Sequence, residues 1–399
     1  MFKSSLYIGI LVVLISMLES CHKTVPGPLP AETRLEGSVE GLSPSQLSMH
    51  QRGDAAFNQV FTSATGLGPW FVANSCASCH AGDGKGTPFT VLTRFGQSDS
   101  TGNKYLDAGA PQLQHRALPG FEPESIPVGA PTARFMAPAN TGLGYLELVS
   151  DDDIIHRADP TDSNADGISG RVNWCVLPAY VSLRPGALTV GGKYIGRFGK
   201  KASVYDLLQQ TVNAYNQDMG ITSLYVPAET YPMPQSEPEV SLTVVNELVF
   251  YLRTLKAPER RATEDADVIS GERIFNETDC EHCHRSTFKT VSNTGIMALS
   301  EKEFHPYTDL LLHNMGNGLS DGYTEGSAAP DEWRTAPLWG LGLSKQSQGG
   351  SYFLLHDGRA HSIEEAIVMH GGEAFNSVEK FKALSGMQKQ QLIKFLESL

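Results

Sequence analysis

Cys76-Ala77-Ser78-Cys79-His80 and Cys280-Glu281-His282-Cys283-His284 are the two stretches that decide the architecture of this chain. Both have the form Cys-x-x-Cys-His, in which two thiols add across the two vinyl groups of a haem and the adjacent histidine reaches the iron. A redox or zinc site built on Cys-x-x-Cys would not require histidine in the fifth place twice. The spacing therefore predicts two covalently attached haem c groups, with His80 and His284 as iron ligands.

The flanks of the two motifs repeat each other. Gly53-Asp54-Ala55-Ala56-Phe57 precedes the first motif, and Gly271-Glu272-Arg273-Ile274-Phe275 precedes the second. Both halves end alike, in residues 247–255 and 391–399, where apolar residues follow the spacing of one helix face. A helix with glycine and an aromatic residue, a haem motif and a terminal amphipathic helix is the order of a cytochrome c domain. Glycine in the first helix would allow the two helices to cross closely.

This repeat predicts a mainly α fold with two cytochrome c-like haem domains and long loops. The first domain covers residues 48–256 and carries a large insertion, the second covers residues 271–399, and residues 257–270 link them. The 399 residues are 40% hydrophobic and include 39 Gly and 23 Pro, which indicates a globular chain with long loops. The net charge is −13 and no basic stripe is present, so nucleic acid is excluded as a partner.

The N-terminus is typical of an export signal. Lys3 supplies the positive charge, and residues 7–18 form an apolar run too short to span a bilayer comfortably. Leu18-Glu19-Ser20-Cys21 resembles the lipobox of bacterial lipoproteins, and an ordinary cleaved signal is the alternative. We predict a signal peptide over residues 1–20, lipidation of Cys21 and a flexible tether over residues 21–47. The protein would then lie in the periplasm or on the outer membrane of a Gram-negative bacterium, touching membrane only through its lipid anchor.

The C-terminal part resembles that of the bacterial di-haem cytochrome c peroxidase family. His356-Asp357-Gly358 is followed by Ser362-Ile363-Glu364-Glu365-Ala366, a helix start with serine as the cap. In that family the residue 14 positions after this histidine is a methionine that ligates the C-terminal haem. Here that position is His370, and Met369 precedes it. The resemblance implies ligation by His284 and His370, with Met369 as the alternative.

A series of further segments resembles the di-haem oxidoreductases that are also labelled thiol oxidoreductases. These segments are residues 166–171, 196–199, 218–222, 306–316, 332–340, 356–360 and 370–374, in order. The family usually has Trp where Lys200 stands and Asp where Asn314 stands. The first departure concerns the region between the haems, where an aromatic residue often serves electron transfer. The resemblance extends to MauG in architecture only, and the sequence gives no support for a thiol substrate.

A peroxidase needs an iron with an open position and an acid/base group that moves the peroxide proton. The resemblance makes the N-terminal haem the reactive one. Glu147 is the acid/base candidate, because it lies among apolar residues that could raise its pKa. Arg134 could stabilise a peroxide or a haem propionate. Both residues could equally be structural, and His115, Met136 or Met219 could instead close the open position.

The insertion contains a possible calcium loop. Asp162-Ser163-Asn164-Ala165-Asp166-Gly167 has the spacing D-x-N-x-D-G, which directs alternate oxygens at one Ca²⁺. The twelfth position of a full calcium loop would need Glu, but Asn173 stands there. An Asx-rich turn is the alternative to calcium binding by Asp162, Asn164 and Asp166.

Two functions of different classes follow from the sequence. The first is a peroxidase-like oxidoreductase that reduces a small oxidant such as hydrogen peroxide at the N-terminal haem, with electrons relayed through the C-terminal haem. The second is an electron-transfer cytochrome in which no substrate reaches metal. The large insertion and the peroxidase-like second domain favour the enzyme. The electron donor would be a cytochrome or similar redox protein, and the acidic surface favours a basic one.

Overall fold

The computed structural model describes residues 34–227, 238–292 and 295–399. The chain divides into a unit of residues 1–34 and a unit from Leu35 to Leu399, and the second unit is the one described below. The predicted signal peptide over residues 1–20, the predicted lipidation site Cys21 and the tether up to residue 33 lie outside the described residues. In the described part of the chain, no helix combines the length and apolar character that a bilayer crossing needs.

Within the described residues, helices (3₁₀ and π turns included) are the main regular structure, with 35% of the residues against 12% in strands. The helices are α2 (Pro44–Phe57), α3 (Leu143–Glu147), α4 (Asp151–Ile155), α5 (Leu207–Asn213), α6 (Leu242–Thr254), α7 (Ala266–Glu277), α8 (Ser344–Ser347), α9 (Ile363–Val368), α10 (Phe375–Ala383) and α11 (Gly386–Ser398). The strands are β1 (Trp70–Phe71), β2 (Leu92–Phe95), β3 (Arg116–Ala117), β4 (Thr132–Phe135), β5 (Trp174–Cys175), β6 (Thr189–Val190), β7 (Lys193–Ile195), β8 (Phe288–Lys289), β9 (Glu303–Phe304), β10 (Leu312–Asn314) and β11 (Glu332–Arg334). They form small antiparallel sheets, β1–β3, β2–β4, β5–β7–β6, β8–β9 and β10–β11.

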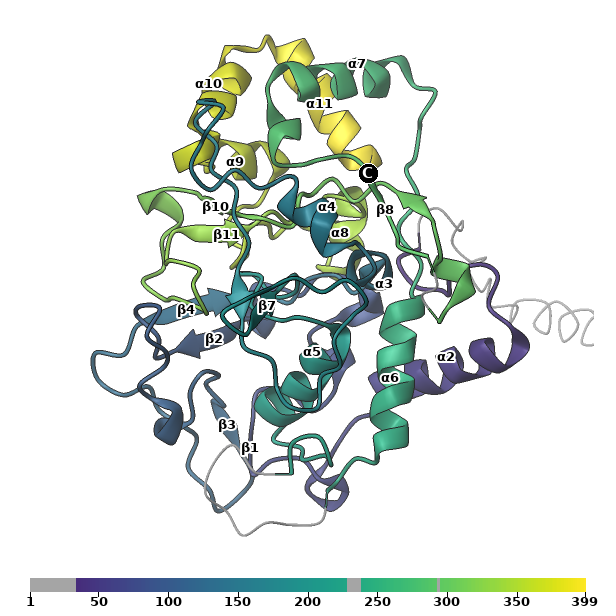
Figure 1. Cartoon of the computed structure of the whole chain (residues 1–399), viewed down its shortest axis with the longest axis vertical. Helices are drawn as coiled ribbons and strands as arrows, with labels where there is room; N and C mark the ends of the chain where they lie inside the picture. The colour runs from purple at the N-terminus through teal and green to yellow at the C-terminus, as the bar shows by residue number, and fades with distance from the viewer. Residues whose placement is uncertain (1–33, 228–237, 293–294) are drawn as a thin grey trace, which may run out of the picture. The chain divides into compact units, whose positions relative to one another are not determined.

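Two pairs of helices cross closely, each around one glycine. In Figure 1, α2 lies across α6, and α7 lies against α11. A Cβ on Gly53 would stand 2.1 Å from the carbonyl oxygen of Glu247, and a Cβ on Gly271 would stand 2.0 Å from that of Gln391. No other residue fits either crossing without moving a helix, because real Cβ atoms do not approach that closely. The predicted close crossing is confirmed at both places.

Serine side chains start three of the four helices in these pairs, and the Asp265 side chain starts α7. Ser43, Ser241 and Ser385 precede α2, α6 and α11, and each side chain accepts a hydrogen bond from the backbone N–H three residues further on. Ser43 and Ser385 also form capping boxes with a glutamine. The repeat therefore extends to the serine caps of α6 and α11, whereas α2 and α7 begin with different cap residues.

The apolar core forms two large clusters that do not follow the predicted boundary between two domains. One cluster consists mainly of side chains from α7, α9, α10 and α11. The other consists of side chains from α2, α5 and α6 and from the insertion, but it also contains Phe288, Phe304, Leu310, Leu311 and Trp339 from the second half. The second half of the chain thus completes the core of the first half. The division at residues 256 and 271 stays a prediction.

The segment before α2 packs against the end of α6. Leu35 and Val39 are buried, and the Val39 N–H donates to the Thr254 carbonyl at 2.8 Å. The sequence predicted a flexible tether as far as residue 47, whereas the structure places Leu35 onward in the packed unit. Apolar residues among the Pro, Gly and Ser of this stretch explain the difference, since they gain by burial.

Candidate haem-binding and catalytic site

The two Cys-x-x-Cys-His motifs fold into the same turn. Each begins with a short 3₁₀ helix, Cys76–Ser78 in the first motif and Cys280–His282 in the second. In both motifs the histidine N–H donates to the carbonyl of the first cysteine, at 3.0 Å. The four cysteines are unpaired thiols and their burial raises the pKa of each. At each motif, the turn leaves two cysteine sulfurs and one histidine imidazole free to bind the same ligand.

Each motif histidine is oriented by a backbone carbonyl. His80 Nδ1 lies 2.8 Å from the Pro138 oxygen, and His284 Nδ1 lies 3.0 Å from the Tyr307 oxygen. A carbonyl only accepts, so Nδ1 carries the proton in both rings and the Nε2 lone pair is left for a metal. Burial lowers the pKa of both imidazoles to about 4, which keeps them neutral, as iron ligation requires.

His370 has the same arrangement at the second motif. It follows α9, and its Nδ1 lies 2.6 Å from the Ala366 oxygen, so Nε2 is again the free nitrogen. Burial lowers the pKa of His370, and a positive charge on it would lower the pKa of His284. The two rings are therefore near neighbours. Met369, the alternative ligand, is the C-cap of α9 and packs against the apolar cluster of α7, α9, α10 and α11.

A group of cations lies beside the first motif. Burial lowers the pKa of Lys85 to about 8, of Lys200 to about 7 and of Arg334 to about 10. The charge of Lys200 also reaches His80 and lowers its pKa. Within the described residues, neither lysine forms an ion pair. Buried cations of this kind need anions, and the two propionates of a haem held by His80 would supply them. The residues present therefore fit the group that the motif implies.

Glu147 does not have the raised pKa that the sequence suggested. It is the last residue of α3, and its carboxylate accepts hydrogen bonds from Arg253 Nε at 2.6 Å and from the Leu207 N–H at 2.8 Å. Burial favours the neutral acid, but the Arg253 guanidinium outweighs it and holds the pKa below the ordinary value. The expected pKa shift was wrong because the partner, more than one hundred residues away in sequence, is invisible from the local apolar context.

Arg134 is exposed on β4, where its Cα pairs with that of Thr93 on β2. No ion pair or side-chain hydrogen bond connects it to the described residues near His80. The alternative ligands at the first site are also occupied elsewhere. His115 is exposed, Met219 lies in the apolar core, and the Met136 sulfur lies 3.8 Å from Gln348 Nε2. Within the described residues, none of these four side chains forms a hydrogen bond or ion pair with His80.

Asp218 is the titratable group near the first motif that sequence reasoning missed. It ends a π-helical turn, Ala214–Asp218, and such turns are frequent at functional sites. Its carbonyl accepts the N–H groups of Val72 and Ala73, which fastens the turn to the strand-like segment leading into Cys76. Burial raises the pKa of Asp218 to about 7, with Arg94 opposing the shift. A charge on Asp218 raises the pKa of both Cys76 and Cys79, so the carboxyl lies within electrostatic range of both sulfurs.

Arg94 connects Asp218 to the second half of the chain. Its guanidinium donates to Gln217 Oε1 at 2.8 Å and to Glu325 Oε1 at 2.7 Å. The charge of Asp218 also raises the pKa of Arg94. Glu325 lies two residues after Tyr323, and the ring of Tyr323 packs against the ring of Phe135 on β4. The first motif is thus bordered by residues from β2, the π turn and the loop before β11.

The predicted calcium loop is closed by hydrogen bonds of its own. The Asp162 carboxylate accepts the Gly167 N–H at 3.2 Å, and Asp166 accepts the Ile168 N–H at 2.9 Å and the Asn164 amide at 3.0 Å. These are the contacts of an Asx-rich turn. Calcium binding by Asp162, Asn164 and Asp166 stays a prediction.

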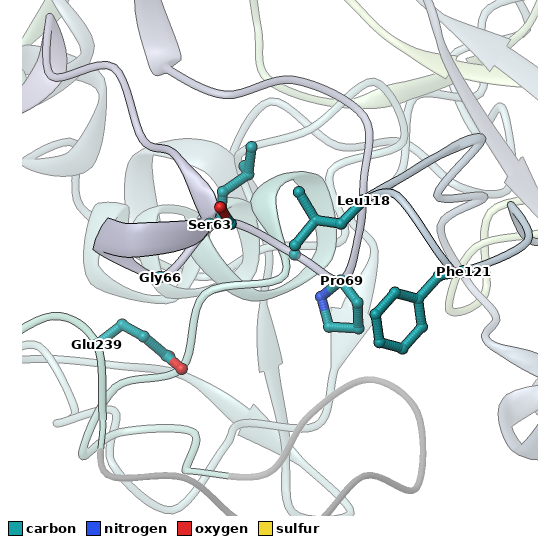
Figure 2. Close-up of a pocket in the computed structure, with 8 residues that line it drawn as sticks. Ser63, Gly66, Pro69, Leu118, Phe121 and Glu239 are labelled. Carbon is teal, nitrogen blue, oxygen red and sulfur yellow. The ribbon is translucent and has the colours of Figure 1, made fainter.

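A pocket of about 240 Å³ lies away from the haem motifs. Its lining consists of Ser63, Gly66, Leu67, Gly68, Pro69, Leu118, Phe121 and Glu239. Figure 2 shows Leu118 and Phe121 on the opposite side of it from Glu239. The Glu239 carboxylate already accepts the Thr222 N–H at 2.7 Å. None of the sequence-predicted site residues lines this pocket, so it is not part of the candidate site.

Two cysteine–histidine turns, each with the imidazole Nε2 left free to bind a metal, fit a protein that holds two haems. The sequence model of the family described as "Di-haem oxidoreductase, putative peroxidase" matches residues 132–399. This match covers well over half of the chain, and the chain belongs to that family. It is therefore an oxidoreductase with haem cofactors, as the sequence analysis expected.

Two solved structures align with nearly all of this chain at low identity. A MauG-like protein associated with microbial copper homeostasis is 15% identical, with 93% of this chain and 94% of that chain covered and a TM-score of 0.41. Hydrazine synthase of Kuenenia stuttgartiensis is 14% identical, with 91% and 94% covered and a TM-score of 0.37. A search of curated proteins found no match. Family membership rests on the sequence match alone.

Proposed function

We propose that this protein is an exported di-haem c-type oxidoreductase that reduces peroxide at the haem of Cys76 and Cys79. Electrons would reach that haem through the second one, held by Cys280 and Cys283. The observation that carries the proposal is the difference between the two sites. At the second site the charge of His370 acts on the pKa of His284, whereas among the described residues no second histidine acts on the pKa of His80.

The residues of the first site can serve this reaction. Bound haem iron would supply the electron-transfer chemistry and a coordination position for the oxidant. His80 would hold the iron through Nε2, with its ring fixed by Pro138. Lys85 and Lys200 would neutralise the propionates. Reduction of one peroxide consumes two electrons and two protons and yields two waters, so the site also needs a group that moves protons.

Asp218 is the group that we assign to this proton movement, in place of Glu147. Its charge acts on both thiols of the first motif, and its pKa of about 7 lets it accept and return a proton at neutral pH. The positive charge of Arg94 keeps the pKa of Asp218 from being higher still. Glu147, by contrast, is held ionised by Arg253 and cannot supply a proton near neutrality.

The second site supports an electron relay. His284 and His370 would both hold the iron of the second haem, which would then supply electron-transfer chemistry and not bind an oxidant. Electron paramagnetic resonance tests both assignments. The oxidised protein should show one high-spin ferric signal that changes on adding peroxide and one low-spin signal that does not. Two low-spin signals unmoved by peroxide, in the oxidised and half-reduced protein, would indicate an electron-transfer cytochrome instead.

The cellular location belongs to the same proposal. The apolar run at residues 7–18 and the lipobox-like segment ending at Cys21 favour a lipoprotein of the periplasm or outer membrane. In cells, Cys21→Ser should abolish labelling by a radioactive fatty acid and release the protein from the membrane fraction. A labelled and membrane-bound Cys21→Ser variant would contradict lipidation at this cysteine. An acidic surface would make reduction by a basic donor cytochrome slower at high salt.

A further inference from the structure

A buried histidine lies between two carboxylates beside the second haem motif. His313 Nε2 is 2.8 Å from Asp309 Oδ2, and His313 Nδ1 is 2.7 Å from Glu373 Oε2. The side chains of His313 and Asp309 are 3% exposed and that of Glu373 is 10% exposed. We call these three residues the His313 cluster. None of them is used in the proton movement or the iron ligation proposed above.

All three members of the His313 cluster are charged. Burial opposes the imidazolium, but Asp309 and the hydrogen bonds to it outweigh burial and raise the pKa of His313 well above its ordinary value. Burial likewise opposes both carboxylates, and His313 outweighs it and lowers the pKa of Asp309 and of Glu373. With one cation and two anions, the cluster has a net charge of −1 at neutral pH.

The His313 cluster touches the haem-attachment sulfur. Cys283 Sγ lies 3.8 Å from His313 Nδ1, and the charges of His313, Asp309 and Glu373 all act on the pKa of this thiol. The charges of Asp309 and His313 also act on the pKa of His284. Cys283, Asp309 and His313 could together hold a metal ion, but a haem thioether at Cys283 takes away the thiolate that such a site needs.

The His313 cluster is also joined to the segment that contains the Asx-rich turn. The Ser169 hydroxyl donates to Glu373 Oε1 at 2.8 Å, and the Ser169 N–H donates to Glu373 Oε2 at 3.0 Å. A Cβ on Gly170 would stand 2.7 Å from His313 Cε1, so this glycine allows the backbone to lie directly against the ring. Two consecutive residues of the insertion thus fix the cluster: Ser169 holds the Glu373 carboxylate, and Gly170 lies against the His313 imidazole.

We propose that Asp309, His313 and Glu373 lower the reduction potential of the haem held by Cys280 and Cys283, and that Ser169 links this effect to the insertion. A net negative charge in a buried place favours the ferric state, which is the more positive one. The insertion would then help to set the reduction potential of the second haem. This inference needs the second haem but not the peroxide chemistry, so a failure of the peroxidase assay leaves it intact.

The test is a spectroelectrochemical titration of the purified di-haem protein without peroxide. Glu373→Gln removes one negative charge and keeps an acceptor for His313, so the potential of the second haem should shift to a more positive value. The potential of the first haem should move much less. Asp309→Asn should shift the second haem in the same direction, and it provides an independent variant if Glu373→Gln fails to incorporate haem. The second haem is identified as the one whose spectrum changes in His370→Ala.

Glu379→Gln is the matched control, because it also removes one carboxylate from the same part of the chain. Glu379 lies on α10 with a half-exposed side chain paired to Lys382, where solvent screens its charge. Ser169→Ala removes one donor to Glu373 and should change the potential of the second haem by less than Glu373→Gln does. A second haem whose potential is unchanged, or changed no more than in Glu379→Gln, would overturn the assignment. An unchanged potential in Ser169→Ala alone would overturn the link to the insertion.

Discussion

The pH dependence of peroxide turnover gives the sharpest prediction about Asp218. Its pKa of about 7 means that the ionised fraction rises from about 9% at pH 6 to about 91% at pH 8. Since the ionised carboxylate is the form that accepts the peroxide proton, kcat/KM should increase about tenfold across this range. Asp218→Asn should lower kcat/KM by about 100-fold or more and abolish the increase, because loss of a general acid/base group costs that much.

The assay is steady-state peroxide reduction with a chemical electron donor, run from pH 5.5 to 8.5 on fully haem-loaded protein. Arg94→Gln should move the increase to higher pH, because Arg94 is the cation that opposes the effect of burial on Asp218. Glu124→Gln is the matched control. Burial raises the pKa of Glu124 to about 7 as well, but its charge does not act on Cys76 or Cys79.

A pH profile that stays unchanged in Asp218→Asn would refute the reasoning. Lys200 also has a pKa of about 7, so a pH dependence that survives Asp218→Asn and disappears in Lys200→Gln would transfer the role to that lysine. A reduced rate with an intact pH dependence would make Asp218 a positioning residue.

Three further predictions concern ligation and stability. His370→Ala should convert the second haem to high spin and leave the first unchanged, and an unaltered low-spin resonance signal would contradict ligation by His284 and His370. Gly271→Ala should lower the free energy of unfolding by about 1–3 kcal/mol in a denaturant titration, because its Cβ meets the Gln391 carbonyl; Gly386→Ala, which meets nothing within 4 Å, should not destabilise. Glu147→Gln should cost about 2 kcal/mol by breaking a buried ion pair while the pH profile of turnover keeps its shape. The folded pKa of Glu147 lies below the unfolded value, so its contribution is complete above about pH 4.3 and is lost as the pH falls further, and the two unfolding curves should converge in acid.

The sequence predicted the features that depend on residues close together in the chain. The Cys-x-x-Cys-His spacing corresponds to the turn at both motifs, and Gly53 and Gly271 mark the helix crossings. The position of His370 at the end of a helix is also a local signal, because the serine cap and the following glycines bound that helix. Short-range spacing determines these features, so one sequence is enough to find them.

The features that the sequence missed depend on distant partners. The sequence around Glu147 predicted a raised pKa, but the fold places Arg253 beside this carboxylate. In the sequence, Asp218 is only one residue of a segment that resembles the family, and its raised pKa comes from burial in the fold. His313 belongs to a charged cluster only because Glu373 folds back onto it. Whether a buried acid is neutral or ionised depends on which cation the fold brings to it. Local apolar context gives no information on that point.

The five residues that the second half contributes to the first core have a consequence for biosynthesis. All five come after the second haem motif in the sequence: Phe288, Phe304, Leu310, Leu311 and Trp339. During translation, the N-terminal part therefore cannot close its core until residue 339 has been made, however early its own haem motif emerges. A chain cut within residues 257–270 would leave an N-terminal fragment with exposed apolar surface, prone to self-association. The second haem motif must accordingly have been made before the N-terminal part reaches its final packing.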